Sequence, residues 1–203
     1  LRGPYLRMCH LEQDLVVYDV AKLLDNLFRG DRRIGNDEEF SKKVVLVDEN
    51  EMTAVMMGFP TLKGLSRETP STYVSVLLNQ TAALHYIDVA QEYGLAGDVC
   101  PMPEAELGVS IDDDAPILGA CAVQCNTTCD GSLMSNGRIA KRLELEDGIP
   151  IFQLAAPMRH REDDVQDYAA QEIKNCIAFI EEKTGEKWDW SYYFECAKRV
   201  NES

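Results

Sequence analysis

Long apolar runs are missing from this 203-residue sequence, and so is any excess of basic residues. No stretch approaches the roughly 20 apolar residues that a membrane span needs, and the first residues resemble no part of a signal peptide. Lys and Arg total 20 against 35 Asp and Glu, which gives a formal net charge of −15. A nucleic-acid-binding protein needs a basic face, so this balance argues against that class, and we expect a cytoplasmic protein.

Histidine is also scarce, with three residues in the chain, and internal repeats and low-complexity segments are absent. Cysteine, by contrast, is plentiful, with seven residues. The odd number and the lack of a signal peptide argue against a secreted, disulfide-rich protein. A reducing compartment in which some of the thiols bind a metal is the better interpretation.

Apolar periodicity predicts an α/β fold in which strands and helices alternate. Expected strands cover residues 44–47, 116–120 and 149–154, and residues 64–70 read as a loop. Expected helices cover residues 11–28, 51–57, 71–93, 130–143, 163–183 and 191–200. This alternation is typical of a Rossmann-like parallel sheet flanked by helices. We therefore expect an N-terminal helical segment over residues 1–40 and one α/β lobe over residues 41–203.

Three cysteines follow the second predicted strand at intervals of four residues: Cys121, Cys125 and Cys129. Parallel sheets bind ligands beyond the carboxyl ends of their strands, which is where these thiols fall. Cys129 directly precedes a predicted helix, whose N-terminal N–H groups stabilise a thiolate or an anionic cluster. Cys129 is thus the strongest ligand candidate, Cys121 reads as a packing residue, and Cys125 fits either role.

Cys100 is a second ligand candidate, because it stands before Pro101 and Pro103 and opens a short helix. Cys176 and Cys196 lie on predicted helices and read as core residues, since free cysteine packs as a small hydrophobe. Zinc would favour a Cys-x-x-Cys pair or nearby histidines, and neither occurs here. Ligation by thiolates alone suits an iron–sulfur cluster at least as well.

Glu51 is the candidate active-site carboxylate. It follows the first predicted strand at the start of a helix, near the expected carboxyl edge of the sheet. The alternative is a helix-start residue that the helix dipole favours.

Three segments together give the sequence a likeness to a known family. They are residues 98–108 (DVCPMPEAELG), residues 125–131 (CNTTCDG), and residues 148–157 (GIPIFQLAAP) with the later helix ending IEEKTG at Gly185. With these motifs, the chain from about Lys42 onward resembles the 2-hydroxyacyl-CoA dehydratase family, which includes the benzoyl-CoA reductase subunits.

The resemblance implies a dehydratase component that removes water from a 2-hydroxyacyl-CoA through a ketyl radical. It implies a [4Fe–4S] cluster on three cysteines per subunit, of which Cys100 and Cys129 match the first two, with Cys125 as the substitute. Glu51 roughly matches the family's acidic residue. The implied partners are a second subunit and an ATP-dependent activator protein with its own iron–sulfur cluster, which delivers one electron.

The chain departs from the family in ending where a second lobe, which carries the third cysteine, is expected to begin. It therefore reads as the N-terminal half of a subunit. Two alternatives stay open. One is a reductase-type subunit that acts on an aromatic acyl-CoA, and the other is a non-catalytic iron–sulfur partner.

Overall fold

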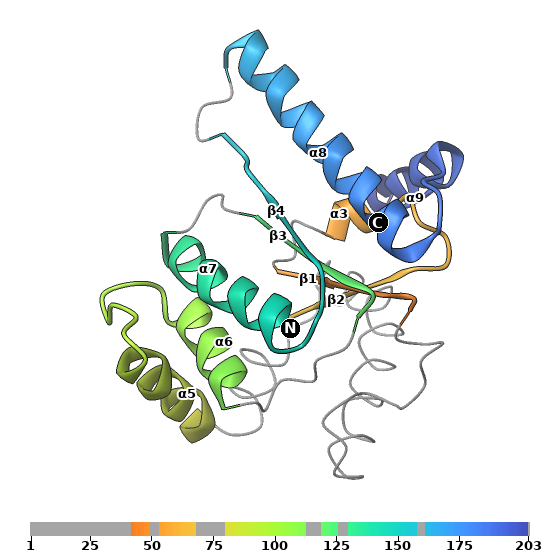
Figure 1. Ribbon diagram of the computed structural model, residues 1–203. Coiled ribbons are helices and arrows are strands. Elements are labelled where there is room, and N and C mark those ends of the chain that lie inside the picture. The colour runs from red at the N-terminus through yellow and green to blue at the C-terminus, as the bar shows by residue number, and fades with distance from the viewer. Residues whose placement is uncertain are drawn as a thin grey trace.

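A four-stranded sheet, all parallel, forms the centre of the computed structural model (Figure 1). The structure describes residues 42–48, 53–67, 80–112, 119–125, 130–157 and 161–202. The strands are β1 (Val44–Val47), β2 (Lys63–Ser66), β3 (Cys121–Cys125) and β4 (Ile151–Leu154). They lie in the order β2-β1-β3-β4, and every neighbouring pair is parallel. The expected Rossmann-like α/β class is confirmed.

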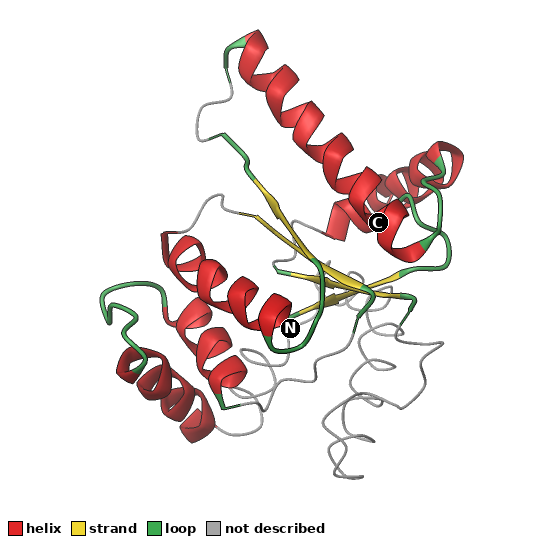
Figure 2. Cartoon of the chain, viewed as in Figure 1, coloured by secondary structure: helices red, strands yellow, loops and turns green. Residues whose placement is uncertain are grey.

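Helices cover both faces of this sheet and make three layers (Figure 2). The described helices are α3 (Thr53–Met56), α5 (Gln80–Glu92), α6 (Pro101–Ile111), α7 (Asp130–Leu145), α8 (Asp163–Thr184) and α9 (Trp190–Glu202). One layer contains α5, α6 and α7, and the other contains α3, α8 and α9 (Figure 1). Among the described residues, none of the helices has the length and apolar character needed to cross a bilayer.

Strand β1 lies at the heart of the core, because its four residues are all buried. Successive side chains of a strand point to opposite faces, so β1 serves both layers. Val44 and Leu46 pack against Leu107 of α6 and Ile139 of α7. The remaining two valines of β1 pack on the other face, in a cluster of buried residues: Val45, Val47, Val55, Met56, Phe59, Cys121, Val123, Leu154, Cys176 and Ile180.

The strand order places a topological switch point between β1 and β3. The chain leaves β1 for β2 on one side and later returns to β3 and β4 on the other side. The helix between β1 and β2 (α3) and the helix between β3 and β4 (α7) lie on opposite faces (Figure 1), and a crevice site is expected at the carboxyl ends of β1 and β3.

Strand β2 contradicts the loop predicted for residues 64–70. Its sequence, Lys-Gly-Leu-Ser, has low strand propensity, and pairing with β1 in register Val44–Lys63 overrides that preference. A Cβ at Gly64 would lie 2.9 Å from the Met56 side chain, so the glycine lets α3 approach the strand closely.

Strand β3 begins later than predicted. It covers Cys121–Cys125, whereas the sequence indicated residues 116–120. Cys125 thus ends a strand and does not belong to the loop that the spacing indicated. Burial decides which residues form the strand, because residues 121–124 are all enclosed between the two helical layers.

Helix α8 has the predicted extent, but its apolar stripe is only partly buried. Cys176 and Ile180 are buried, whereas Tyr168 and Ile173 are exposed. The first half of α8 runs beyond the ends of the strands, so it has no sheet to pack against (Figure 1). A left-handed Gly185, with φ of 77°, ends the helix as expected.

The segment after α8 carries an aromatic cluster. The Trp188 ring packs edge-on against Phe59 at 5.3 Å between centroids, and it also contacts Trp190 and Tyr193. A Cβ at Gly58 would lie 2.4 Å from the Trp188 ring, so glycine is required there. None of the α9 side chains is buried, and Cys196 is only half-buried, so the core position predicted for Cys196 is wrong.

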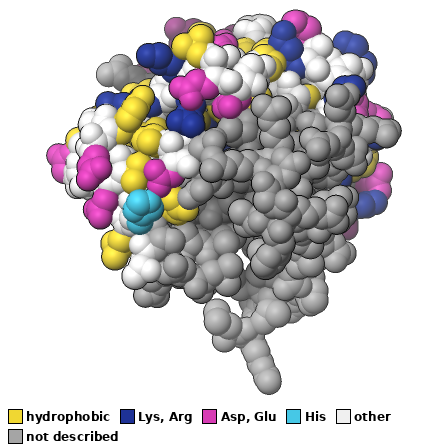
Figure 3. Space-filling model, turned by 60° about the horizontal axis from the view of Figure 1, so that its bottom comes forward, with side chains coloured by type: hydrophobic (Ala, Val, Ile, Leu, Met, Phe, Trp, Pro, Cys, Tyr) yellow, Lys and Arg dark blue, Asp and Glu magenta, His cyan; other side chains and the backbone are white. Residues whose placement is uncertain are grey.

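On the face shown in Figure 3, Lys and Arg side chains are interspersed with Asp and Glu side chains over the described residues. The N-terminal helical segment predicted over residues 1–40 lies outside the described residues, as does the start of the helix predicted from residue 71.

Candidate functional site

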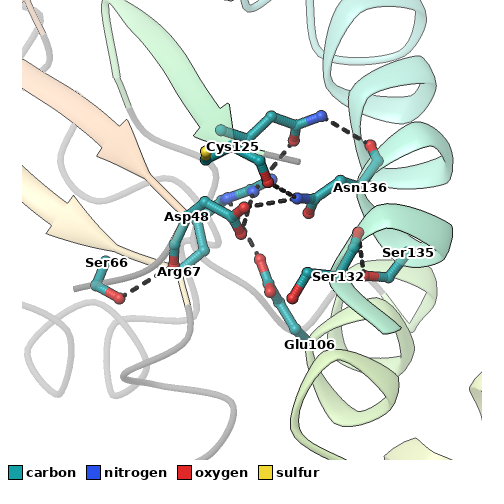
Figure 4. A network of polar contacts seen from close by, with 9 residues as sticks. Asp48, Ser66, Arg67, Glu106, Cys125, Ser132, Ser135 and Asn136 are labelled. Atoms are coloured by element: carbon teal, nitrogen blue, oxygen red, sulfur yellow. Dashed lines mark hydrogen bonds and ion pairs between the residues drawn. The ribbon is translucent and has the colours of Figure 1, made fainter. Parts of the chain in front are cut away.

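Polar side chains gather at the carboxyl ends of three neighbouring strands (Figure 4). Asp48 directly follows β1, Arg67 directly follows β2, and Gln124 is the penultimate residue of β3. Asp48 and Gln124 are each about 1% exposed. The backbone joins these ends as well, because Asp48 N–H donates to Val123 O at 3.2 Å. The switch point therefore carries a buried polar network.

Arg67 lies at the centre of this network. Its Nη2 donates to Asp48 Oδ1 at 3.1 Å and to Gln124 Oε1 at 3.3 Å. Its Nε lies 3.3 Å from Oε1 of Glu106, which α6 contributes. A guanidinium can bridge two carboxylates because its N–H donors form a planar fork, which a lysine lacks.

Asn136 of α7 completes the network. Its Nδ2 donates to Asp48 Oδ2 at 2.6 Å and to the carbonyl of Cys125 at 3.1 Å. Gln124 Nε2 in turn donates to the backbone carbonyl of Asn136 at 3.0 Å. Among the described residues, nothing donates to the buried Asn136 Oδ1. That oxygen is an acceptor available to a water or to a ligand N–H or O–H group.

Removing one partner of such a buried charged pair leaves the other charge uncompensated, at a cost of about 3–5 kcal/mol. Sequence reasoning missed all five residues of this network. Asp48 could have been found, because a carboxylate directly follows a strand that is buried on both faces. Arg67 could not, because the strand before it was not recognised.

Cys100 is the exposed thiol of the candidate site. It is the residue before α6, its backbone is extended, and its side chain makes no capping hydrogen bond. Pro101 starts the helix, a position where the missing N–H loses no hydrogen bond. The carboxyl ends of the strands and the start of α6 face the same edge of the molecule (Figure 1). Cys100 is thus free, accessible and at the expected edge.

Cys125 is half-buried and packs with the cluster on the α8 face of the sheet. On that face, burial raises the pKa of the Cys121 thiol to about 12. Burial also raises the pKa of the Cys176 thiol to about 12, with smaller contributions from Cys121 and Cys125. The packing roles predicted for Cys121 and Cys176 are confirmed. Since Cys100 begins a helix of the opposite layer, Cys125 and Cys100 belong to different layers.

Cys129 and Glu51 lie outside the described residues. Helix α7 begins at Asp130, directly after Cys129, as the sequence predicts. Within the described part of the chain, no three His, Cys, Asp or Glu side chains lie close enough together to hold a metal ion. Among the described cysteines, Cys100 is the exposed one.

Comparison with known families gives a match over most of the chain. The sequence model of the family described as "2-hydroxyglutaryl-CoA dehydratase, D-component" matches residues 52–203. The match includes Cys100, Glu106, Cys129 and Asn136, and begins just after Asp48. No curated protein matches the chain.

Proposed function

Because the chain belongs to the 2-hydroxyglutaryl-CoA dehydratase D-component family, we propose that it is the cluster-bearing lobe of a 2-hydroxyacyl-CoA dehydratase component. In this proposal Cys100 and Cys129 hold a [4Fe–4S] cluster. A third ligand comes from Cys125, from a second lobe or from a partner subunit. A second subunit and an ATP-dependent activator protein are the expected partners.

The observation that supports this proposal is the placement of Cys100. It is a free, exposed thiol at the start of α6, on the edge of a parallel sheet where ligands bind. The described thiols of Cys100, Cys121, Cys176 and Cys196 are free, which favours a reducing compartment such as the cytoplasm. Cys125 packs against the apolar cluster on the α8 face, which makes it a weaker ligand candidate than Cys100.

The reaction removes water from a 2-hydroxyacyl-CoA thioester. When bound, the cluster would supply one electron to the thioester carbonyl, giving a ketyl radical, and would take the electron back after hydroxide has left the α-carbon and a proton has left the β-carbon. Cys129 directly precedes α7 in the sequence, and the dipole of a helix favours negative charge at its N-terminus. Glu51 would act on the substrate side, as an acid–base group or as a hydrogen-bond partner.

Iron and sulfide analysis of anaerobically purified protein tests the proposal. We expect a brown protein with charge-transfer absorbance near roughly 400 nm, and we expect Cys100→Ser and Cys129→Ser each to abolish most of that absorbance. Cys196→Ser is the matched control, because Cys196 is a half-buried thiol on α9. A colourless wild-type protein after reconstitution with iron and sulfide would contradict the proposal, and so would unchanged absorbance in both ligand variants.

A further inference from the structure

Asn136 of α7 carries a buried hydrogen-bond acceptor that none of the described donors reaches. The residue is 4% exposed, and nothing in the described part of the chain donates to its Oδ1 atom. Buried polar atoms nearly always have a partner, because leaving one unpaired costs free energy. An oxygen of this kind therefore indicates a place for a donor group from a ligand or a water.

The orientation of this amide is fixed by its other two contacts. Nδ2 of Asn136 donates to Asp48 Oδ2 at 2.6 Å and to the carbonyl oxygen of Cys125 at 3.1 Å. Both partners are acceptors, so a flipped amide would place its oxygen against two other oxygens. Gln124 also holds the backbone, because its Nε2 donates to Asn136 O at 3.0 Å. The acceptor is thus held in one direction.

The position of Asn136 in the fold suits contact with a ligand. Figure 4 shows its side chain reaching from α7 to Asp48 and Cys125, which stand at the carboxyl ends of β1 and β3. These two strand ends form the topological switch point, where doubly wound sheets bind ligands. The unpaired acceptor therefore lies at the edge of the sheet where a substrate is expected.

The charges in this network limit the kind of group that can bind. The carboxylates of Asp48 and Glu106 are both buried, and both contact Arg67. A phosphate or carboxylate of a ligand would be repelled by these two carboxylates, and it would bring no proton to Asn136 Oδ1. The group that matches this oxygen is an O–H or N–H donor.

The burial of Oδ1 limits the size of that group. Since the oxygen is enclosed, neighbouring side chains have to move when a ligand group enters, and a hydroxyl requires the least movement. A 2-hydroxyacyl-CoA carries such a hydroxyl on the carbon next to the thioester. Its CoA part also carries hydroxyl and amide donors, so a test has to compare two thioesters that share the CoA part.

We propose that Asn136 Oδ1 accepts a hydrogen bond from the 2-hydroxyl group of the substrate. Asn136 thereby distinguishes a 2-hydroxyacyl-CoA from an acyl-CoA that lacks this hydroxyl. The inference rests on the proposed function, which supplies the substrate class, and it involves none of the proposed cluster ligands.

Calorimetric titration of the full chain with 2-hydroxyglutaryl-CoA and with glutaryl-CoA tests the inference. The first carries the acyl group after which the family is named, and the second lacks only its hydroxyl. We expect wild type to bind the better enantiomer of 2-hydroxyglutaryl-CoA about tenfold more tightly than glutaryl-CoA, because glutaryl-CoA leaves Oδ1 unpaired. Asn136→Ala removes the acceptor and should bring the two affinities within about twofold of each other.

Ser135→Ala is the matched control and should keep the wild-type ratio of affinities. Ser135 is the neighbouring residue on α7, is fully buried, and donates to Ser132 O. A merely structural effect of Asn136→Ala would weaken the binding of both thioesters equally and leave their ratio unchanged. Thermal unfolding verifies that each variant is folded. If Asn136→Ala does not fold, Asn136→Ser takes its place, because its shorter side chain removes the acceptor and keeps a hydrogen-bonding group.

Equal binding of the two thioesters by wild type overturns the inference, since Oδ1 then has only a water as its partner. A tenfold preference for the hydroxy compound that persists in the folded Asn136 variant overturns it as well. Wild type that binds neither thioester contradicts the proposed substrate class, a result that differs from equal binding of both.

Discussion

At the scale of single residues, three of the described cysteines fall into two chemical groups. Cys121 and Cys176 are fully buried in the apolar cluster between the sheet and α8, and burial raises the pKa of both thiols to about 12. Cys100 is exposed at a helix start. Thiolate is the reactive form, so the two groups differ in both access and chemistry.

Alkylation of the folded protein should separate these groups. We expect iodoacetamide at about pH 8 to modify Cys100 quickly and to leave Cys121 and Cys176 unmodified until urea unfolds the chain. Mass spectrometry of the peptides measures the extent of modification at each position. Rapid native-state labelling of Cys176 would show that the α8 layer opens readily, against the burial described above.

At the scale of elements, one contact between helices depends on a glycine. A Cβ added at Gly108 of α6 would lie 1.9 Å from the carbonyl oxygen of Tyr86 in α5, which is far closer than van der Waals contact allows. The backbones of α5 and α6 therefore approach each other closely. Helix propensity alone would disfavour glycine at this position.

Gly108→Ala should destabilise the protein by about 2–3 kcal/mol, because α5 and α6 must separate to admit a methyl group. Gly137→Ala is the control. Gly137 lies on α7, and a Cβ there would meet nothing within 4 Å. We expect that control to be neutral or to stabilise the protein by up to about 1 kcal/mol. Urea unfolding of both variants gives the two free energies, and equal effects would contradict this account.

The elements also show how far sequence patterns reach. The periodicity of residues 163–183 and the apolar run of residues 44–47 were sufficient to predict α8 and β1. Strand β2 was missed because Lys63 and Gly64 carry no strand signal, and only pairing with β1 makes them extended. The exposed half of α8 was missed because periodicity shows which face is apolar and not whether another element covers it.

In the candidate site, too, local sequence patterns predicted some features, and others needed the tertiary structure. Local sequence predicted that thiols lie next to helix starts, and this is confirmed for the start of α6 after Cys100 and the start of α7 at Asp130. The polar network joins Asp48, Arg67, Glu106, Gln124 and Asn136, which come from five separate elements or strand ends. No local pattern connects them, so the network required the tertiary structure.

At the scale of the whole molecule, the net charge is −15. The stability of such an acidic chain depends on how its carboxylates are paired. The connection between α8 and α9 gives one example. Glu181 accepts hydrogen bonds from the backbone N–H of Trp188 and from Lys187 Nζ, each at 2.9 Å. These contacts hold the pKa of the Glu181 carboxyl below its ordinary value, with the Trp188 N–H as the larger cause.

A lowered folded-state pKa means that the Glu181 contribution to stability is present above the unfolded-state pKa. That contribution is lost as the pH falls through the folded-state pKa. We therefore expect Glu181→Gln to lower the free energy of unfolding at neutral pH by roughly 1 kcal/mol, with the difference from wild type shrinking below about pH 4.

Urea unfolding over a series of pH values measures this dependence. Glu202→Gln, which removes an exposed partner of Lys198 on α9, is the control and should change little at any pH. If Glu181→Gln lowers the free energy of unfolding by the same amount down to acid pH, the carboxylate charge is not the source of that loss.

The position of β1 between β2 and β3 has a consequence for biosynthesis. As the ribosome extends the chain, β1 and β2 emerge early and can pair, but the other edge of β1 must wait until β3 has been made. During that interval an apolar strand edge is open to other nascent chains. Polypeptides that stall before Cys121 should therefore depend most on chaperones.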